Sequence, residues 1–516
     1  MNEQEFGSAP IGKLFVRCIV PAMVGMGFSA IYSITDGIFV GHFIGQEALA
    51  AVNLVMPIIM IITALADMVA TGSSVRISIL LGRGDDKEAN RVFTVCIGLI
   101  AAIATVFGLL GCLFARQVIS LMGAEGMTAD YAVEYLRVFA LFMPLCCIYY
   151  STDNYLRVCG QVNLSMTINI VCSLLNIVLD VLLIVVLEQG LWAAAVASCA
   201  SMSIGAVWSL VPFVRRKLPL VFSKGWIGMR QMLAIVANGS SEFFVSIAGS
   251  LFAVVVNIVL LRLGGSTAVA AAAIVEYVAS LTGMVIHSMT DALQPAISYC
   301  FGAGLLQRMR RIQRVVMSAA AILSLLSMLF LMFGGRLLLP LFIKDGDTAL
   351  YALSIRAMQL YAFSYLVSWI DGTLAGFMTA VERPWHSLAI SLLGTCVYPL
   401  LFLAVLVPLW GLDGVWIHHV VAGVFSAVTA VLIVRRVQLQ EPTNEARVER
   451  TRLFCLARRR KSEAQPPSSP PVASFLQPTL SLDFIRPFLA MPKLKQVWLW
   501  SSGLTKTFNY RRKAHI

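Results

Sequence analysis

The sequence carries little charge. Of its 516 residues, 13% are charged and 59% are hydrophobic, whereas soluble domains are about a quarter charged and about half apolar. The mean hydropathy is +0.82. Apolar runs follow one another along the chain, each about the 20 residues that a helix needs to cross a bilayer. The short alternating segments of a membrane β-barrel are missing, so the sequence predicts an all-α polytopic membrane protein.

The sequence also lacks the motifs of enzymes and of ATP-driven pumps. It contains no Walker lysine motif, no HExxH and no GxSxG. Its 11 cysteines show no CxxC spacing, and most lie inside apolar runs. This pattern excludes a zinc site and a disulfide framework. We therefore predict a protein that is not an enzyme and that needs no cofactor.

The positive charge is concentrated at the end of the chain. The formal net charge is +12, and residues 437–516 alone hold 14 Lys/Arg against 5 Asp/Glu. The remaining, membrane-spanning part is nearly neutral, which argues against a nucleic-acid partner. The tail includes PPSSPP at 466–471 and RRRK at 458–461, a composition typical of disorder. A membrane-surface segment around Trp498 and Trp500, or a segment without function, are the alternatives.

The apolar runs predict about twelve transmembrane helices. We place them at 14–40, 47–71, 92–115, 131–156, 165–187, 191–214, 231–261, 266–299, 312–334, 350–380, 386–409 and 412–434. With an intracellular N-terminus, the loops on the inner side hold fourteen Lys/Arg and the opposite loops hold four. The positive-inside rule then predicts a multi-pass membrane protein with both termini in the cytoplasm. The inner membrane of a bacterial cell is its expected location.

The two halves of the chain resemble each other at an offset of about 220 residues. GQEALAAVNLV at 45–55 aligns with GSTAVAAAAIV at 265–275, and Arg91 aligns with Arg311. The offset carries each span to the one six later, so the halves are parallel repeats. The predicted organisation is an N-lobe (1–214), a cytoplasmic linker (215–230), a C-lobe (231–436) and the basic tail (437–516). Two six-helix lobes around a cleft suit alternating access.

Several motifs occur in an order typical of one family. They are IYSITDGIFVG (31–41), GQEALAAVNLV (45–55), LNIVLD (175–180), GLWAAAVAS (190–198), LQPAISY (293–299), FGAG (301–304) and GLDGVW (411–416). Over about residues 10–436 the chain resembles the bacterial and archaeal branch of the MATE (multidrug and toxic compound extrusion) transporters. The resemblance implies a V-shaped fold of two lobes related by pseudo-two-fold symmetry. It also implies efflux of organic, often cationic compounds by antiport with H⁺ or Na⁺.

Acidic side chains inside the spans are the candidate functional residues, because a carboxylate in hydrocarbon is costly. Asn176 and Asp180 are four residues apart and share one helix face. The family resemblance places Asp36 beside this pair and Ser198 where relatives often have Thr. Together the four form a predicted ion-coupling site of hard oxygen ligands, suited to a proton or to Na⁺. A helix-packing hydrogen bond is the alternative role of Asn176 and Asp180.

Other polar residues within the predicted spans have more than one plausible role. Glu276, Asp291 and Gln294 are candidate polar sites of the C-lobe, although Gln294 beside Pro295 also suits helix packing and bending. Asp67, Asp153, Glu242 and Asp371 are further acids that could lie at span ends in contact with water. His287 favours a helix-packing role over proton transfer.

The sequence therefore predicts a secondary multidrug exporter. Its expected partners are small cationic or amphipathic molecules and membrane lipid, and it is expected to act as a monomer. A flippase for lipid-linked oligosaccharide is the main alternative, although the spans hold few of the arginines that a pyrophosphate would need. A membrane receptor or structural subunit explains the repeat and the buried acids less well.

Overall fold

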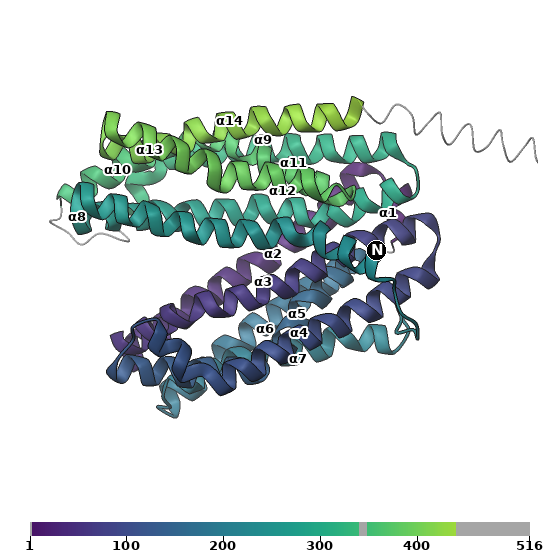
Figure 1. Ribbon diagram of the computed structural model, residues 1–516, viewed down its shortest axis with the longest axis horizontal. Coiled ribbons are helices and arrows are strands. Elements are labelled where there is room, and N and C mark those ends of the chain that lie inside the picture. Colours follow the sequence, from purple (N-terminus) through teal and green to yellow (C-terminus); the bar gives the residue numbers. More distant parts are fainter. Residues whose placement is uncertain (1–2, 340–347, 440–516) are drawn as a thin grey trace, which may run out of the picture. The chain divides into compact units, whose positions relative to one another are not determined.

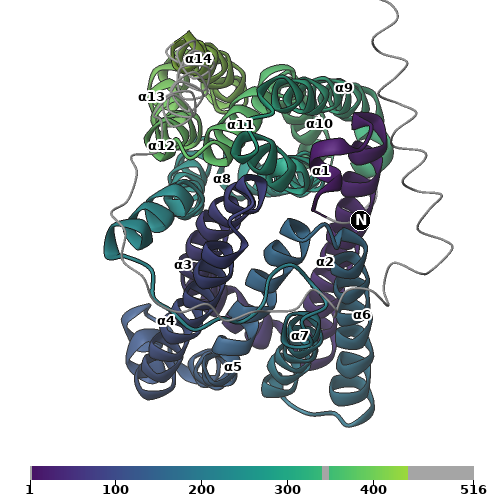
Figure 2. The same ribbon diagram turned by 90° about the vertical axis from the view of Figure 1, so that its right-hand side faces the viewer.

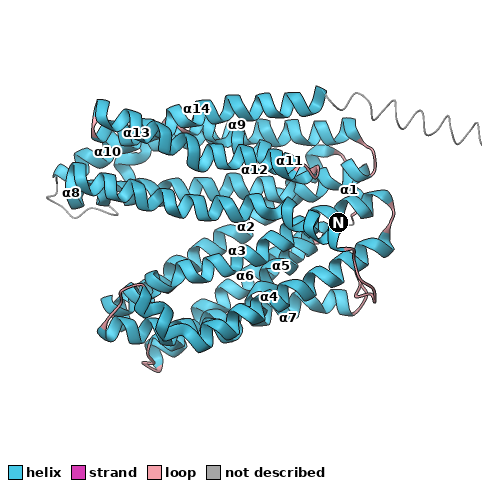
Figure 3. Ribbon diagram, viewed as in Figure 1, coloured by secondary structure: helices cyan, strands magenta, loops and turns pink. Residues whose placement is uncertain are grey.

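A computed structural model describes residues 3–339 and 348–439 of the chain. Within these residues the secondary structure is helical, with short turns and one linker between the helices and no strand (Figure 3). The predicted all-α fold is confirmed. Most of the predicted tail lies outside the described residues.

The first half of the chain forms a bundle in which α4, α5 and α7 pack on α3 or on one another and α2 packs on α6 (Figure 1). Its elements are α1 (Glu5–Ser8), α2 (Ile11–Phe39), the π-helical segment η1 (Val40–Ile44), α3 (Gln46–Arg83), α4 (Asp86–Leu121), α5 (Gly126–Val158), α6 (Val162–Asp180), the π-helical segment η2 (Val181–Val186) and α7 (Leu191–Val214).

The second half forms a bundle of its own, in which α9, α10, α11 and α12 pack on α8 and α13 packs on α14. Its elements are α8 (Met229–Gly302), α9 (Leu306–Leu338), α10 (Thr348–Ala362), α11 (Tyr365–Ala380), α12 (Pro384–Leu392), the π-helical segment η4 (Leu393–Val397), α13 (Tyr398–Trp410) and α14 (Leu412–Leu439).

The helices agree with the predicted spans, with two differences in how they are divided. Among the described residues, ten helical stretches are long and apolar enough to cross a membrane. The longest of them, α8, joins the predicted spans 231–261 and 266–299, and its one non-helical residue is Gly265 (φ 64°, ψ −156°). The predicted span 350–380 is divided between α10 and α11, because the helix is interrupted at Phe363 and Ser364. Counted as spans, the described helices match the twelve that were predicted.

Glycines allow the two halves to approach closely where α3 meets α8, two helices that lie side by side in Figure 2. A Cβ atom added at Gly82 would lie 2.2 Å from the Tyr299 carbonyl oxygen, and one at Gly302 would lie 2.1 Å from that of Ile79. The repeat offset of 220 turns the contact of Gly82 with Tyr299 into the contact of Gly302 with Ile79. This crossing therefore lies on the pseudo-two-fold axis. A second crossing pairs Gly72 with Gly239.

The N-terminal segment and the linker are held at the same end of the helices as this crossing. The Arg308 guanidinium donates to the carbonyl oxygens of Phe6, at 2.7 Å, and of Ala9. In the first half, the linker backbone donates from Val221 to Asn90 and from Ser223 to Thr94. The arginine-rich turns of both halves therefore share one end of the molecule.

Candidate functional site

The helix packing brings the predicted acids of the first half together. A Cβ atom at Gly25 of α2 would lie 3.7 Å from the Asn169 side chain of α6, so the helices touch at this pair. Asp36 follows Gly25 by eleven residues, and Asp180 follows Asn169 by eleven. Since eleven residues make about three turns, each acid lies on the face that carries the contact. The two carboxylates come close enough to interact electrostatically.

Asn176 and Ser198 complete this cluster. With its amide nitrogen facing the carboxylate, Asn176 donates to Asp180 Oδ2 at 3.2 Å, and its oxygen accepts from Ser198 Oγ at 3.0 Å. Ser198 lies on α7, so three helices contribute to the site. We call Asp36, Asn176, Asp180 and Ser198 the N-lobe polar cluster. The Asn176–Ser198 hydrogen bond joins α6 to α7, and a role of these residues in ion coupling stays a prediction.

The N-lobe polar cluster has unsatisfied acceptors. Asp36 is 7% exposed and Asp180 is fully buried. Within the described part of the chain, Oδ1 of each aspartate lacks a hydrogen-bond partner. Buried carboxylate oxygens normally have partners, and hard oxygen donors of this kind suit a proton or Na⁺. The residues present therefore fit the predicted coupling ion.

The backbone near these acids departs from the α-helix. Asp180 directly precedes η2, and Asp36 lies one turn before η1. The two π-helical segments also pack against each other. Such π-bulges often occur at functional sites.

Tyr135 of α5 is a member of this region that the sequence did not indicate. Its side chain is 1% exposed and lies within electrostatic range of both Asp36 and Asp180. Its hydroxyl also lacks a partner among the described residues. No local motif marks this tyrosine; only the packing of α5 places it here.

The second half contains a cavity of about 350 Å³ lined by α8, α10, α11 and α12 together with Thr395 of η4. Three carboxylates line it, from Glu242, Asp291 and Asp371, together with His287 and three aromatic residues, Tyr361, Tyr365 and Trp369. His287 Nδ1 lies 3.1 Å from Asp291 Oδ2. Asp371 accepts from Ser426 Oγ at 3.0 Å and from the Gly372 amide at 2.9 Å. We call this the C-lobe cavity.

The remaining candidates lie elsewhere. Glu276 is exposed and is not among the residues that line the C-lobe cavity. It precedes Asp291 by fifteen residues, about 22 Å along a helix, so the structure does not bring these two acids together. Gln294 is 8% exposed and lies outside the lining.

Asp67 and Asp153 have structural partners. Asp67 accepts from Asn154 at 3.2 Å. Asp153 pairs with Arg157 at 2.6 Å and also accepts from Ser165 and Asn169. Their carboxylates therefore stabilise the packing of α5 against its neighbours.

Comparison with known sequences identifies relatives over most of the chain. A sequence model of the MatE family matches residues 21–182 and 243–404, one segment in each half. Proteins named multidrug export protein MepA are similar to the chain. The one from Staphylococcus saprophyticus is 25% identical over 434 residues, which cover 83% of this chain and 94% of the relative. The one from Staphylococcus haemolyticus is 26% identical over 435 residues, with the same coverage.

Solved structures share the fold. A MATE crystal structure described as the bent conformation superposes with a TM-score of 0.80 at 23% identity, covering 86% of this chain and 99% of that one. An outward-facing multidrug resistance transporter of the same superfamily gives a TM-score of 0.79 at 23% identity, covering 84% and 98%. The arrangement as two lobes of six spans is thus shared with these structures.

Proposed function

The chain belongs to the MatE family, and from that premise we propose that it exports organic, mainly cationic compounds by antiport with H⁺ or Na⁺. The observation that carries the proposal is the N-lobe polar cluster. Two buried carboxylates with unsatisfied oxygens can take up one small cation and release it again. The MepA relatives, whose name describes multidrug export, support the choice of substrates.

The C-lobe cavity supports a cationic substrate. Its acids attract positive charge, and its aromatic rings offer faces on which an organic cation can rest. Concave sites with a few polar groups among aromatic side chains are typical of small-molecule binding. The lining contains no Lys or Arg among the described residues. A lipid-linked pyrophosphate would be repelled by these carboxylates, so the flippase alternative fits less well.

Coupling follows from competition between the two cations. When Asp36 and Asp180 are ionised, the N-lobe favours the arrangement that admits a cationic substrate. Uptake of H⁺ or Na⁺ from outside neutralises the cluster and changes the packing of α2 against α6, so the N-lobe no longer favours that arrangement. If the lobes exchange between inward and outward access only when one cation is bound, each substrate leaves in exchange for an entering ion.

The proposed orientation places both termini and the linker in the cytoplasm of a bacterial cell. The shared position of the N-terminal segment, the linker and the arginine-rich turns at one end supports it. On a background without native cysteines, a cysteine at Lys224 should resist an impermeant maleimide in intact cells and react after permeabilisation. Reaction in intact cells would reverse the orientation.

The test of the function is transport in everted membrane vesicles with proton and sodium gradients imposed separately. A fluorescent organic cation such as ethidium should accumulate in vesicles with the wild-type chain when one of the two gradients is applied. Asp36→Asn should abolish this accumulation at unchanged protein level. Asp130→Asn is the control, because Asp130 is 71% exposed and pairs only at the surface with Arg116. Wild-type rates in Asp36→Asn would refute the coupling site and direct attention to Asp291 and Glu242.

A further inference from the structure

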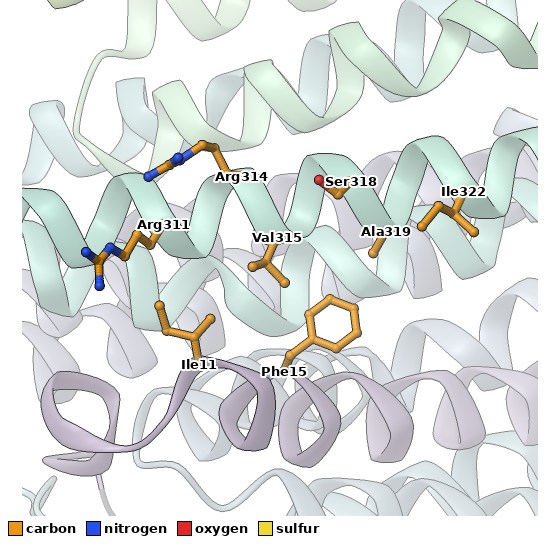
Figure 4. A pocket seen from close by; sticks show the side chains of 8 residues that line it. All are labelled: Ile11, Phe15, Arg311, Arg314, Val315, Ser318, Ala319 and Ile322. Carbon is orange, nitrogen blue, oxygen red and sulfur yellow. The ribbon is translucent and has the colours of Figure 1, made fainter.

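A groove of about 730 Å³ lies between the start of α2 and the first half of α9. Opposite Ile11 and Phe15 of α2, the α9 side of the groove begins with two arginines and continues with apolar residues and one serine, Ser318 (Figure 4). The arginines are Arg311 and Arg314, and Val315 and Ile322 follow them. The groove thus has a cationic end and an apolar end.

The spacing along α9 fits the depth of one membrane leaflet. Arg311, Val315, Ser318 and Ile322 are separated by four, three and four residues, so they lie on one helix face. From residue 311 to 322 the helix rises about 16 Å, about half of the 30 Å hydrocarbon thickness. Ile322 is 62% exposed, and the neighbouring apolar side chain of Leu326 is 57% exposed. The apolar end of the groove is therefore continuous with the lipid-facing surface.

The arginines have no internal counter-charge. Neither Arg311 nor Arg314 makes a hydrogen bond or an ion pair within the part of the chain that the structure describes, and both are exposed. The repeat makes the contrast clear, because Arg91, the counterpart of Arg311, pairs with Glu88 at 3.2 Å. The counterpart of Glu88 in the second half is another arginine, Arg308.

The same contrast holds for the neighbouring positions. In the first half, Asn90 and Thr94 accept hydrogen bonds from the linker backbone. Their counterparts at the repeat offset are Arg310 and Arg314. In the first half, this surface pairs its own charges and is covered by the linker. At the matching positions the second half has arginines without a partner among the described residues, and these lie beside an apolar groove.

We propose that this groove binds an anionic phospholipid. The phosphate of its headgroup contacts Arg311 and Arg314, and one acyl chain lies along Phe15, Val315 and Ile322. Basic pockets between helices at the cytoplasmic side recognise anionic headgroups in this way. A cationic drug would be repelled by the arginines, and a soluble anion would gain nothing from the apolar half of the groove.

A lipid in this groove would touch both lobes. Phe15 belongs to the first span of the N-lobe, whereas the arginines belong to the ninth span, in the C-lobe. Lipid binding would therefore favour the arrangement in which α2 and α9 lie together, which is the arrangement in this structure. The binding itself does not depend on transport, so it can be tested even where the coupling mechanism fails.

The test is native mass spectrometry of the detergent-purified full-length chain, titrated with phosphatidylglycerol or with phosphatidylcholine of the same acyl chains. Wild-type protein should bind phosphatidylglycerol about tenfold more tightly. Arg311→Gln with Arg314→Gln should remove this preference, because each arginine near a charged membrane surface contributes substantially to anionic-lipid attraction. The exposed arginines carry no internal contact, so the fold should be unaffected.

Two further variants separate the headgroup, the acyl chain and general surface charge. Ala319→Trp should fill the groove and lower the binding of phosphatidylglycerol while leaving both arginines in place. Arg91→Gln, at the matched repeat position, should leave the preference unchanged. Glycerol phosphate at equal concentration should not displace the lipid. Equal binding of the two lipids, an equal loss in Arg91→Gln, or full displacement by glycerol phosphate would each overturn the proposal.

Discussion

Asp36 and Asp180 act as one unit if they share one cation. Asp36→Asn and Asp180→Asn should each reduce gradient-driven efflux of an organic cation to background. The double variant should lose little more than either single variant, because residues of one site are strongly non-additive. Initial efflux rates from cells with matched protein levels measure this. Fully additive partial losses would show that the two carboxylates work independently.

Tyr135 and Tyr155 offer a matched pair of buried hydroxyls. Tyr155 is fully buried, and its hydroxyl lies 2.7 Å from Ser73 Oγ, whereas the Tyr135 hydroxyl beside the N-lobe polar cluster lacks a partner among the described residues. Tyr155→Phe should therefore lower the free energy of unfolding by about 1 kcal/mol and leave coupling intact. Tyr135→Phe should keep or raise stability and impair coupled efflux.

Thermal unfolding in detergent and vesicle transport, measured on the same preparations, separate these two effects. A loss of stability in Tyr135→Phe equal to that in Tyr155→Phe, with normal transport, would assign Tyr135 to packing alone.

At the scale of the element, α3 and α8 meet through glycine. A Cβ atom at Gly239 would lie 1.8 Å from the Met68 carbonyl oxygen, and one at Gly72 would lie 2.0 Å from that of Ile235. Because backbone atoms cannot give way as a flexible side chain does, Gly239→Ala must separate the helices. We expect a loss of about 1–3 kcal/mol, typical of overpacking, and a lower melting temperature.

Gly98 of α4 is the matched control for this substitution. A Cβ atom there meets no atom within 4 Å, so Gly98→Ala should be neutral or stabilising by up to about 1 kcal/mol, as expected from helix propensity. Similar melting temperatures for the two alanine variants would show that the crossing tolerates a wider helix separation.

At the scale of the whole molecule, an ion pair between Arg76 and Glu382 connects the halves near this crossing. Arg76 Nη1 of α3 lies 3.2 Å from both carboxylate oxygens of Glu382, in the turn between α11 and α12. The side chains are 25% and 31% exposed. Breaking the pair with Arg76→Gln should shift the lobes toward the arrangement that is open at this end, by at most about fivefold, because partly exposed pairs contribute little.

Spin labels at Lys87 and Trp385, one exposed position in each lobe at this end, can report the change as longer interlabel distances. The charge-exchanged variant Arg76→Glu with Glu382→Arg should restore the original distribution. Arg116→Gln, which removes an exposed pair within the N-lobe, should have no effect. Unchanged distances in Arg76→Gln would mean that the glycine crossings alone hold this end closed.

The length of the apolar runs was sufficient to predict the spans, because lipid leaves the backbone no partner except itself. The predicted span 191–214 coincides with α7, Leu191–Val214. Predicted and observed elements differ at Gly265 and around Phe363 and Ser364, where one backbone angle or one broken turn decides whether two helices are joined. The sequence shows that residue 265 is a glycine, but it does not specify the backbone conformation of that residue.

For the candidate site, too, some features follow from local sequence and others depend on tertiary packing. The shared face of Asn176 and Asp180 follows from their spacing, since a helix places residues four apart side by side. The position of Asp36 depends on the contact of Gly25 with α6, and that of Tyr135 on the packing of α5. The C-lobe cavity gathers Glu242, His287 and Asp371 from distant parts of the chain. Local patterns determined which residues are polar within the membrane, and only long-range helix packing decided which of them meet.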